Sequence, residues 1–330
     1  MMLGRKLVIL LVVLVMVLPL CGWVVLRLPL QPLAAGLLDM PVGAGAGELA
    51  GKLRERHGMA MPAWTFRIYT RLNGSAARLK AGEYQVRDGE SVASLLGRMV
   101  DGDVVSRRVV LVEGWTFRQV LAALHRSPRL EHRLRGMQEP EVRSLLGIQR
   151  PNLEGQFLPD TYAYVAGMSD LDILKLAHAR MNELLRKRWA ERAPGLPYVT
   201  PYEALIVASL VEKETGRAED RDDIAAVFVR RLRLGMRLQT DPTVIYALGE
   251  RFDGNLRRVD LALDHPYNTY VYAGLPPSPI ALSGDAALTA ALNPSASDAL
   301  FFVARGDGSS EFSATLREHE AAVDRFQRGN

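Results

Sequence analysis

The segment TPYEALIVASLVEKETG, residues 200–216, has the most complete helix pattern in this chain of 330 residues. Thr200 is a typical N-cap residue, Pro201 suits the first turn, and Glu203 completes a capping box. Gly216 is expected to end the helix, since glycine commonly follows the last helical turn. Start and end signals of this kind predict a helix with well-defined ends.

Two glutamates lie near the end of this predicted helix. Glu212 and Glu214 are two residues apart, about 200° around a helix, so they are predicted to face opposite sides. Glu212 shares its side with Leu205, Ala208 and Ser209, which are small or apolar. A carboxyl group on such a side loses solvation, which raises its pKa towards the range useful for a proton donor.

The next helix offers a purely structural role for Glu212. Residues 221–234 are predicted to form a second helix, which ends at Gly235. An arginine of that helix, such as Arg230 or Arg231, is a suitable ion-pair partner for the carboxylate. On periodicity alone, this structural alternative is preferred over a catalytic role.

Composition narrows the classes of protein to consider. The chain is 48% hydrophobic and 24% charged, which is typical of a globular protein, and its net charge is only +4. No long basic run is present, so nucleic-acid binding is not predicted. A single cysteine, Cys21, excludes an internal disulfide, and the six histidines show no metal-ligand spacing. No metal or cofactor is predicted.

The N-terminus predicts a membrane anchor. Residues 7–26 contain no charge, and as a helix they span about 30 Å, the thickness of the hydrocarbon core of a bilayer. Arg5 and Lys6 precede the run, so residues 1–6 are expected in the cytoplasm and everything after the anchor, 7–27, on the extracytoplasmic side. We therefore predict a single-pass protein of the inner membrane. The alternative, a cleaved signal peptide, is less favoured because the small residues 34–36 lie well beyond the apolar run.

Beyond the anchor, the patterns predict an α+β protein with two folded parts. Residues 28–47, rich in proline, glycine and alanine, are typical of a linker, and 48–107 are expected to form a small α+β subdomain before a larger α+β domain at 108–330. The patterns for the small subdomain are helical at 48–56 and 91–99 and strand-like at 79–86 and 104–112.

Three loop-like stretches are dense in polar and aromatic residues: 152–162, 239–243 and 264–270. Such mixtures suit sugars, because hydroxyl groups need hydrogen-bonding partners and sugar rings stack on aromatic side chains. Ordinary turns favour the same residue types, so each stretch taken alone is weak evidence for a binding site.

Several ordered sequence blocks resemble one protein family. They are LEG with Phe157 and PDTY at 153–162, ASLVEKET at 208–215, VFVRRL at 227–232, GMRLQTDPTVIY at 235–246, YNTY at 267–270 and GLPP at 274–277. In these blocks the chain resembles the endolytic murein transglycosylases, the MltG or YceG-like family. The resemblance covers nearly everything after the linker and is densest from Asn152 onwards.

The resemblance implies roles for individual residues. The catalytic acid of the family falls on Glu212. The positions that match its substrate-binding motifs are Gln239, Thr240, Asp241, Tyr246, Asn268 and Tyr270. The small subdomain is expected to be LysM-like and to bind glycan. One departure concerns Ser309 and Ser310, which stand where family members often carry Gly-His, so any substrate contact of that histidine is absent here.

The implied reaction is cleavage of the bond between N-acetylmuramic acid and N-acetylglucosamine, with formation of 1,6-anhydro ends. One acid suffices, because the muramoyl C6 hydroxyl replaces water as the nucleophile. The resemblance also implies glycan-polymerising penicillin-binding proteins as partners, and no cofactor. Two alternatives remain: a hydrolytic muramidase with Asp241 as second carboxylate, and a peptidoglycan-binding protein without catalytic activity.

Overall fold

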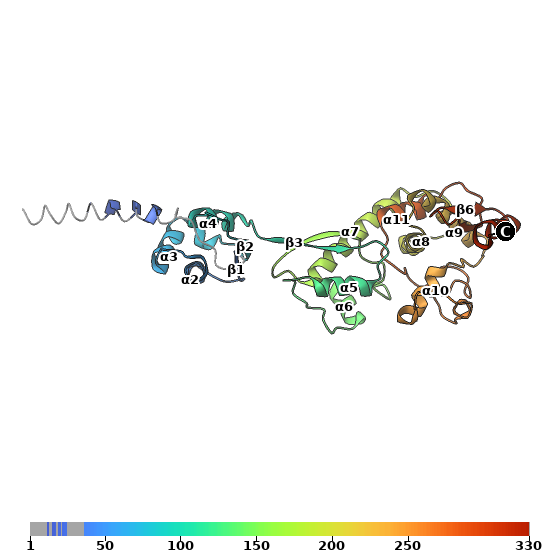
Figure 1. Cartoon of the computed structure of the whole chain (residues 1–330), viewed down its shortest axis with the longest axis horizontal. Coiled ribbons are helices and arrows are strands. Elements are labelled where there is room, and N and C mark those ends of the chain that lie inside the picture. Colours follow the sequence, from blue (N-terminus) through green and yellow to red (C-terminus); the bar gives the residue numbers. More distant parts are fainter. Residues whose placement is uncertain (1–11, 13–14, 18, 21, 25–35, 330) are drawn as a thin grey trace, which may run out of the picture. The chain divides into compact units, whose positions relative to one another are not determined.

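The computed structural model describes residues 12, 15–17, 19–20, 22–24 and 36–329 (Figure 1). Much of the predicted anchor and residues 28–35 of the predicted linker fall outside these residues. The rest of the predicted linker, 36–47, is not a simple loop, because it contains a strand at Leu37–Met40 and the start of a helix at Ala46. Among the residues that are described, none of the helices combines the length and the apolar character needed to cross a bilayer. The chain divides into two compact units: unit 1 extends to Arg107 and includes Ala163–Met168, and unit 2 contains Arg108–Tyr162 and Ser169–Asn330.

Between residues 36 and 107, unit 1 packs the helices α2, α3 and α4 with a two-stranded sheet (Figure 1). Its elements are β1 (Leu37–Met40), α2 (Ala46–His57), α3 (Ala63–Leu72), β2 (Gly82–Gln85) and α4 (Val92–Asp101). The strands β1 and β2 are antiparallel, with Leu38 opposite Tyr84. The core includes Leu38, Met40, Leu49, Leu53, Met59, Met61, Phe66, Tyr84, Leu95, Leu96 and Met99. The α+β character predicted for this part is present, although the sequence patterns did not identify α3.

Helix α4 illustrates how the sequence determines local structure in unit 1. Ser91 is its N-cap, and the side chain accepts a hydrogen bond from the backbone N–H of Ser94. The apolar residues of its pattern, Val92, Leu95, Leu96 and Met99, are all buried. Gly102, with φ of 83°, ends the helix in the left-handed conformation that glycine adopts without strain.

Unit 2 is mainly helical. The elements from the unit boundary onwards are β3 (Ser106–Leu111), α5 (Phe117–Arg126), α6 (Glu139–Leu146), β4 (Asp160–Val165), α7 (Asp170–Ala190), α8 (Pro201–Glu214), α9 (Arg221–Arg233), α10 (Asp241–Leu248), α11 (Asp285–Leu292), β5 (Phe301–Ala304), β6 (Ser310–Ser313) and α12 (Leu316–Val323). Strand β3 pairs with β4, and β5 pairs antiparallel with β6. A mixed α+β architecture is thus confirmed.

Helix α8 lies at the centre of the core of unit 2, where it packs on α7, α9, α10 and α11 (Figure 1). The capping box predicted from Thr200 and Glu203 is present: each side chain accepts a hydrogen bond from the other residue's backbone N–H. All residues from Ala204 to Val211 are buried, so only the last turn of α8 reaches more exposed surroundings. That last turn carries Glu212 and Glu214.

The departure at Ser309 and Ser310 leaves the turn between β5 and β6 intact. The hydroxyl group of Ser309 donates to Asp307 at 2.6 Å, and the backbone N–H of Ser310 donates to Asp220 at 2.9 Å. The strands pair in register from Phe301 opposite Ser313 onwards. The hairpin therefore forms with serines at these positions.

Candidate active site

The two glutamates at the end of α8 have different partners, as expected from their separation on the helix. Oε2 of Glu214 accepts a hydrogen bond from Oγ1 of Thr240 at 2.6 Å. Oε2 of Glu212 accepts one from the backbone N–H of Gly284 at 3.0 Å. Each glutamate is half-buried, so each carboxyl group combines restricted solvation with access from outside.

Glu214 lies among residues that the sequence predicted for the substrate site. Burial, as the largest effect, and the charge of Asp241 raise the pKa of Glu214 above its ordinary value. The hydrogen bond from Thr240 and the charge of Arg231 lower it, but the net pKa is raised. Asp241 in turn accepts a hydrogen bond from the hydroxyl group of Tyr270 at 2.6 Å. Glu214 is thus a carboxyl group of raised pKa, and Asp241, held by Tyr270, lies near it.

Two loops hold these partners in place. Gln239 has φ of 50°, a left-handed conformation that is uncommon outside glycine and that occurs often at functional sites. Its backbone N–H donates to the carbonyl oxygen of Thr269 at 3.1 Å, and the N–H of Thr240 donates to Oγ1 of Thr269 at 3.1 Å. The side chain of Gln239 is exposed beside Thr240. The strained loop therefore presents Gln239 outwards while Thr240 points to Glu214.

Arg231 of α9 supports the same loop and pairs with neither glutamate. Its guanidinium group donates to the carbonyl oxygens of Leu238 at 2.7 Å, Leu300 at 2.7 Å and Arg237 at 3.3 Å. Within the described part of the chain, no ion pair within 4.0 Å involves Arg231, Arg230 or either glutamate. The structural alternative considered for Glu212, an ion pair with Arg230 or Arg231, is therefore wrong.

Glu212 lies beside a carboxylate that the sequence did not indicate. A Cβ atom added to Gly284 would lie 1.8 Å from Oε1 of Glu113, so Glu113 contacts the same glycine that donates to Glu212. Burial, as the largest effect, and the charge of Glu113 raise the pKa of Glu212. The hydrogen bond from Gly284 and the charges of Arg221 and Lys213 lower it, but the net pKa is raised. The only sequence signal for Glu113 is its place in a turn after a strand.

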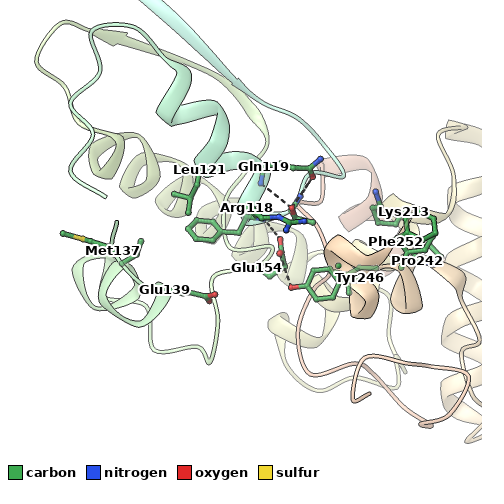
Figure 2. Close-up of a pocket in the computed structure, with 16 residues that line it drawn as sticks. Arg118, Gln119, Leu121, Met137, Glu139, Glu154, Lys213, Pro242, Tyr246 and Phe252 are labelled. Carbon is green, nitrogen blue, oxygen red and sulfur yellow. Dashed lines mark hydrogen bonds between the residues drawn. The ribbon is translucent and has the colours of Figure 1, made fainter. Parts of the chain in front are cut away.

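A pocket of about 630 Å³ opens in unit 2 between the start of α5, helix α6 and helix α10 (Figure 2). Its lining includes Lys213, the residue between the two glutamates. At its inner side Oε1 of Glu154 accepts a hydrogen bond from the N–H of Phe117 at 2.8 Å, and Tyr246 donates to Oε2 at 3.2 Å. The ring centroids of Tyr246 and Tyr267 are 4.8 Å apart. Glu154 thus ties two walls of the pocket together.

Burial raises the pKa of Glu154 from 4.5 to about 7, against the lowering effect of its hydrogen bonds. Between pH 4.5 and about 7, the folded protein keeps the proton on Glu154 while the unfolded chain releases it. The free energy of unfolding that this group contributes therefore falls as pH rises through this range. The free energy of unfolding of the wild type should fall by about 3 kcal/mol across this window because of Glu154, since one pKa unit corresponds to about 1.4 kcal/mol. Glu154→Gln should not show this fall, because glutamine does not titrate. Urea unfolding of both proteins at pH 5 and pH 8 measures the difference, and identical pH slopes would contradict it.

Asn268 has a different role from the predicted one. Its side chain is fully buried; Nδ2 donates to the carbonyl oxygens of Leu261 at 3.0 Å and Leu263 at 2.8 Å, and Oδ1 accepts from the N–H of Tyr270 at 2.9 Å. Both ends of this fully buried amide are engaged by the backbone, so the side chain is not presented to a substrate. Asn268 shapes the loop that carries Tyr270.

The predicted site residues therefore fall into three groups. Thr240, Asp241 and Tyr270 gather near Glu214, with Gln239 exposed beside them. Tyr246 lies at the pocket with Glu154, and Asn268 lies behind the loop. None of the six hydrogen-bonds to Glu212 in the part of the chain that the structure describes. That part also contains no group of three or more His, Cys, Asp or Glu side chains arranged to hold a metal ion.

This arrangement of helices and motif-bearing loops defines a known class. The family model described as the YceG-like family matches residues 38–325, and the chain belongs to this family. A crystal structure of a YceG-like protein from Listeria monocytogenes is similar to it, with a TM-score of 0.57 and 31% sequence identity over 86% of this chain and 97% of that one.

Curated relatives carry one functional name. The endolytic murein transglycosylase of Bacillus subtilis is 29% identical over 307 residues, which cover 88% of this chain and 84% of that protein. That of Streptococcus pneumoniae serotype 2 is 28% identical over 301 residues, 81% of this chain and 54% of the relative. The chain thus matches about half the length of the pneumococcal protein.

Proposed function

We propose that this chain is an endolytic peptidoglycan lytic transglycosylase, which cleaves the MurNAc–GlcNAc bond of nascent glycan strands during cell-wall assembly. Membership of the YceG-like family and the names of the relatives support this activity. The observation that carries it is a half-buried carboxyl group of raised pKa, Glu214, among polar side chains and close in sequence to a pocket-lining residue, Lys213.

The geometry favours Glu214 over Glu212 as the proton donor. The resemblance implied Glu212 as the catalytic acid, but the side chains predicted to bind substrate gather at Glu214. The hydroxyl group of Thr240 also fixes the orientation of the Glu214 carboxyl group, which positioned acid catalysis requires. Glu212 remains the alternative, and the corresponding pair of variants distinguishes them.

In the proposed reaction, protonated Glu214 donates its proton to the glycosidic oxygen, and the bond from that oxygen to C1 of N-acetylmuramic acid breaks. The Glu214 carboxylate then accepts the proton of the C6 hydroxyl group on the same sugar, whose oxygen forms the new bond to C1. The product is a 1,6-anhydro ring, and no water is consumed. An intramolecular nucleophile benefits from a high effective concentration, so no second carboxylate is needed to activate water.

One observation favours a second candidate, hydrolysis by a muramidase. Asp241 lies close enough to Glu214 to raise its pKa, and Tyr270 holds it in place. A second carboxylate near the acid is the arrangement that glycoside hydrolases use to activate water or to stabilise the sugar cation. Our proposal gives Asp241 the role of a fixed charge instead.

Product analysis decides between these reactions. We expect purified glycan strands digested by the full chain to yield muropeptides with 1,6-anhydro ends, which are lighter by one water than reducing ends. Mass spectrometry of the digest measures both. Reducing ends as the main product would assign hydrolysis, and intact strands would leave only glycan binding.

We further propose that residues 7–27 anchor the chain in the inner membrane, with both units on the extracytoplasmic side. The uncharged run 7–26 after Arg5 and Lys6 supports this topology. Unit 1 would serve as a LysM-like glycan-binding module, and glycan-polymerising penicillin-binding proteins are the partners that this function implies. Flotation of the full chain with lipid vesicles after an alkaline wash tests the anchor, and protein left at the bottom of the gradient argues against it.

A further inference from the structure

One face of helix α3 in unit 1 is apolar and exposed. Trp64, Ile68 and Leu72 follow one another at intervals of four residues, so they form a single stripe along the helix. Their exposed fractions are 64%, 51% and 83%. The opposite face buries Phe66 and Thr70 in the core of unit 1, where neither has exposed surface. The three large apolar side chains of the stripe are therefore not needed to pack α3 in the core.

The surroundings of the stripe are basic. Arg67 and Arg71 are exposed on α3, and in the described part of the chain no carboxylate forms an ion pair with either of them. Residues 58–82 contain four basic residues, Arg67, Arg71, Arg78 and Lys80, and no acidic one. An amphipathic helix with arginines beside a tryptophan-containing apolar face is typical of segments that lie in a membrane interface.

Only a short segment lies between the proposed anchor and β1 of unit 1. Ten residues, 27–36, separate the end of the uncharged run at Leu26 from the start of β1 at Leu37. Fully extended, they reach at most about 36 Å. Given the proposed anchor, on which this step rests, the start of β1 stays within that distance of the bilayer surface, so unit 1 remains next to the membrane.

We propose that α3 docks unit 1 on the headgroup layer of the membrane that holds the anchor, with Trp64, Ile68 and Leu72 inserted and the arginines on anionic lipid phosphates. Tryptophan prefers this layer because its ring is apolar and its N–H is polar. Basic residues near the surface are attracted by anionic lipids. A glycan surface is the less suitable occupant, because Ile68 and Leu72 offer no hydrogen bonds to sugar hydroxyl groups.

Tryptophan fluorescence of the full chain in vesicles tests this docking. The vesicles contain phosphatidylethanolamine and phosphatidylglycerol, with bromine on the acyl chains in one of two matched sets. We expect Trp64→Phe to reduce the bromine-sensitive emission by roughly half, because Trp23 in the anchor supplies the remainder. The variant Trp189→Phe, which removes a tryptophan of unit 2, is the matched control and should leave this emission unchanged.

A second variant tests the charge. Replacing Arg67 and Arg71 together by glutamine should weaken the bromine effect on Trp64 in these vesicles. In phosphatidylcholine vesicles, which lack anionic lipid, the same double variant and the wild type should differ little. Equal quenching of the two proteins in both kinds of vesicle would contradict the role of the arginines.

The outcomes separate this inference from the anchor. Protein that floats with the vesicles but shows no bromine effect on Trp64 overturns the docking and leaves the anchor standing. Protein that does not float overturns both. A change in Trp64 emission on addition of soluble glycan strands, without a bromine effect, assigns the face to carbohydrate instead and also overturns the docking.

Discussion

Replacing Glu214 by glutamine is expected to reduce the rate of 1,6-anhydro end formation by about 10²- to 10⁴-fold, the usual contribution of a positioned acid. Glutamine has nearly the same shape, and its side-chain oxygen still accepts the hydrogen bond from Thr240, but it cannot donate and recover a proton in the reaction. Initial rates on purified glycan strands, followed by mass spectrometry of the ends, measure the loss.

The controls for this prediction use other glutamates. Glu212→Gln removes the carboxyl group on the other side of α8, and Glu183→Gln alters an exposed residue of α7. We expect Glu183→Gln to match the wild type and Glu212→Gln to keep a much larger part of the activity than Glu214→Gln. If Glu212→Gln instead causes the greater loss, Glu212 is the proton donor and Glu214 is not.

Local sequence signals determined the part of the site that depends on one helix. The capping box at Thr200 and Glu203 placed the start of α8, and the helical period placed Glu212 and Glu214 on different sides. The same signals could not indicate which side faces the polar loops. Thr240 is 26 residues from Glu214 in the sequence, and their contact depends on how α8, α9 and the following loop pack.

Long-range contacts also explain the residues that the sequence did not reveal. Glu113 meets Gly284 across the fold, and Glu154 binds Phe117 and Tyr246 across 37 and 92 residues. Asn268 shows the converse limitation. A polar residue in a polar loop motif suggests a binding role, but whether backbone carbonyl groups already use its amide is visible only in three dimensions.

Replacing Gly155 by alanine is expected to destabilise unit 2 by about 2–5 kcal/mol, a large part of the stability of a typical domain. Gly155 has φ of 72°, a conformation that costs an L-residue with a side chain about 1–2 kcal/mol. A Cβ atom there would also lie 2.4 Å from Cβ of Pro279, 2.7 Å from its Cγ and 3.2 Å from the carbonyl oxygen of Ala281. Neither the proline ring nor the backbone moves easily, so overpacking adds about 1–3 kcal/mol.

Gly147→Ala is the matched control, because Gly147 has nearly the same φ, 69°, but no atom within 4 Å of the added Cβ. It should lose only the conformational part, about 1–2 kcal/mol, and the difference between the two variants isolates the clash with Pro279. Urea unfolding measures both losses. Equal destabilisation would mean that the Pro279 contact is not tight. The N–H of Gly155 also hydrogen-bonds the carboxyl group of Glu154, so a displaced Gly155 should disturb the pocket. Gly155→Ala should therefore lose activity as well as stability, whereas Gly147→Ala should lose stability but keep its activity.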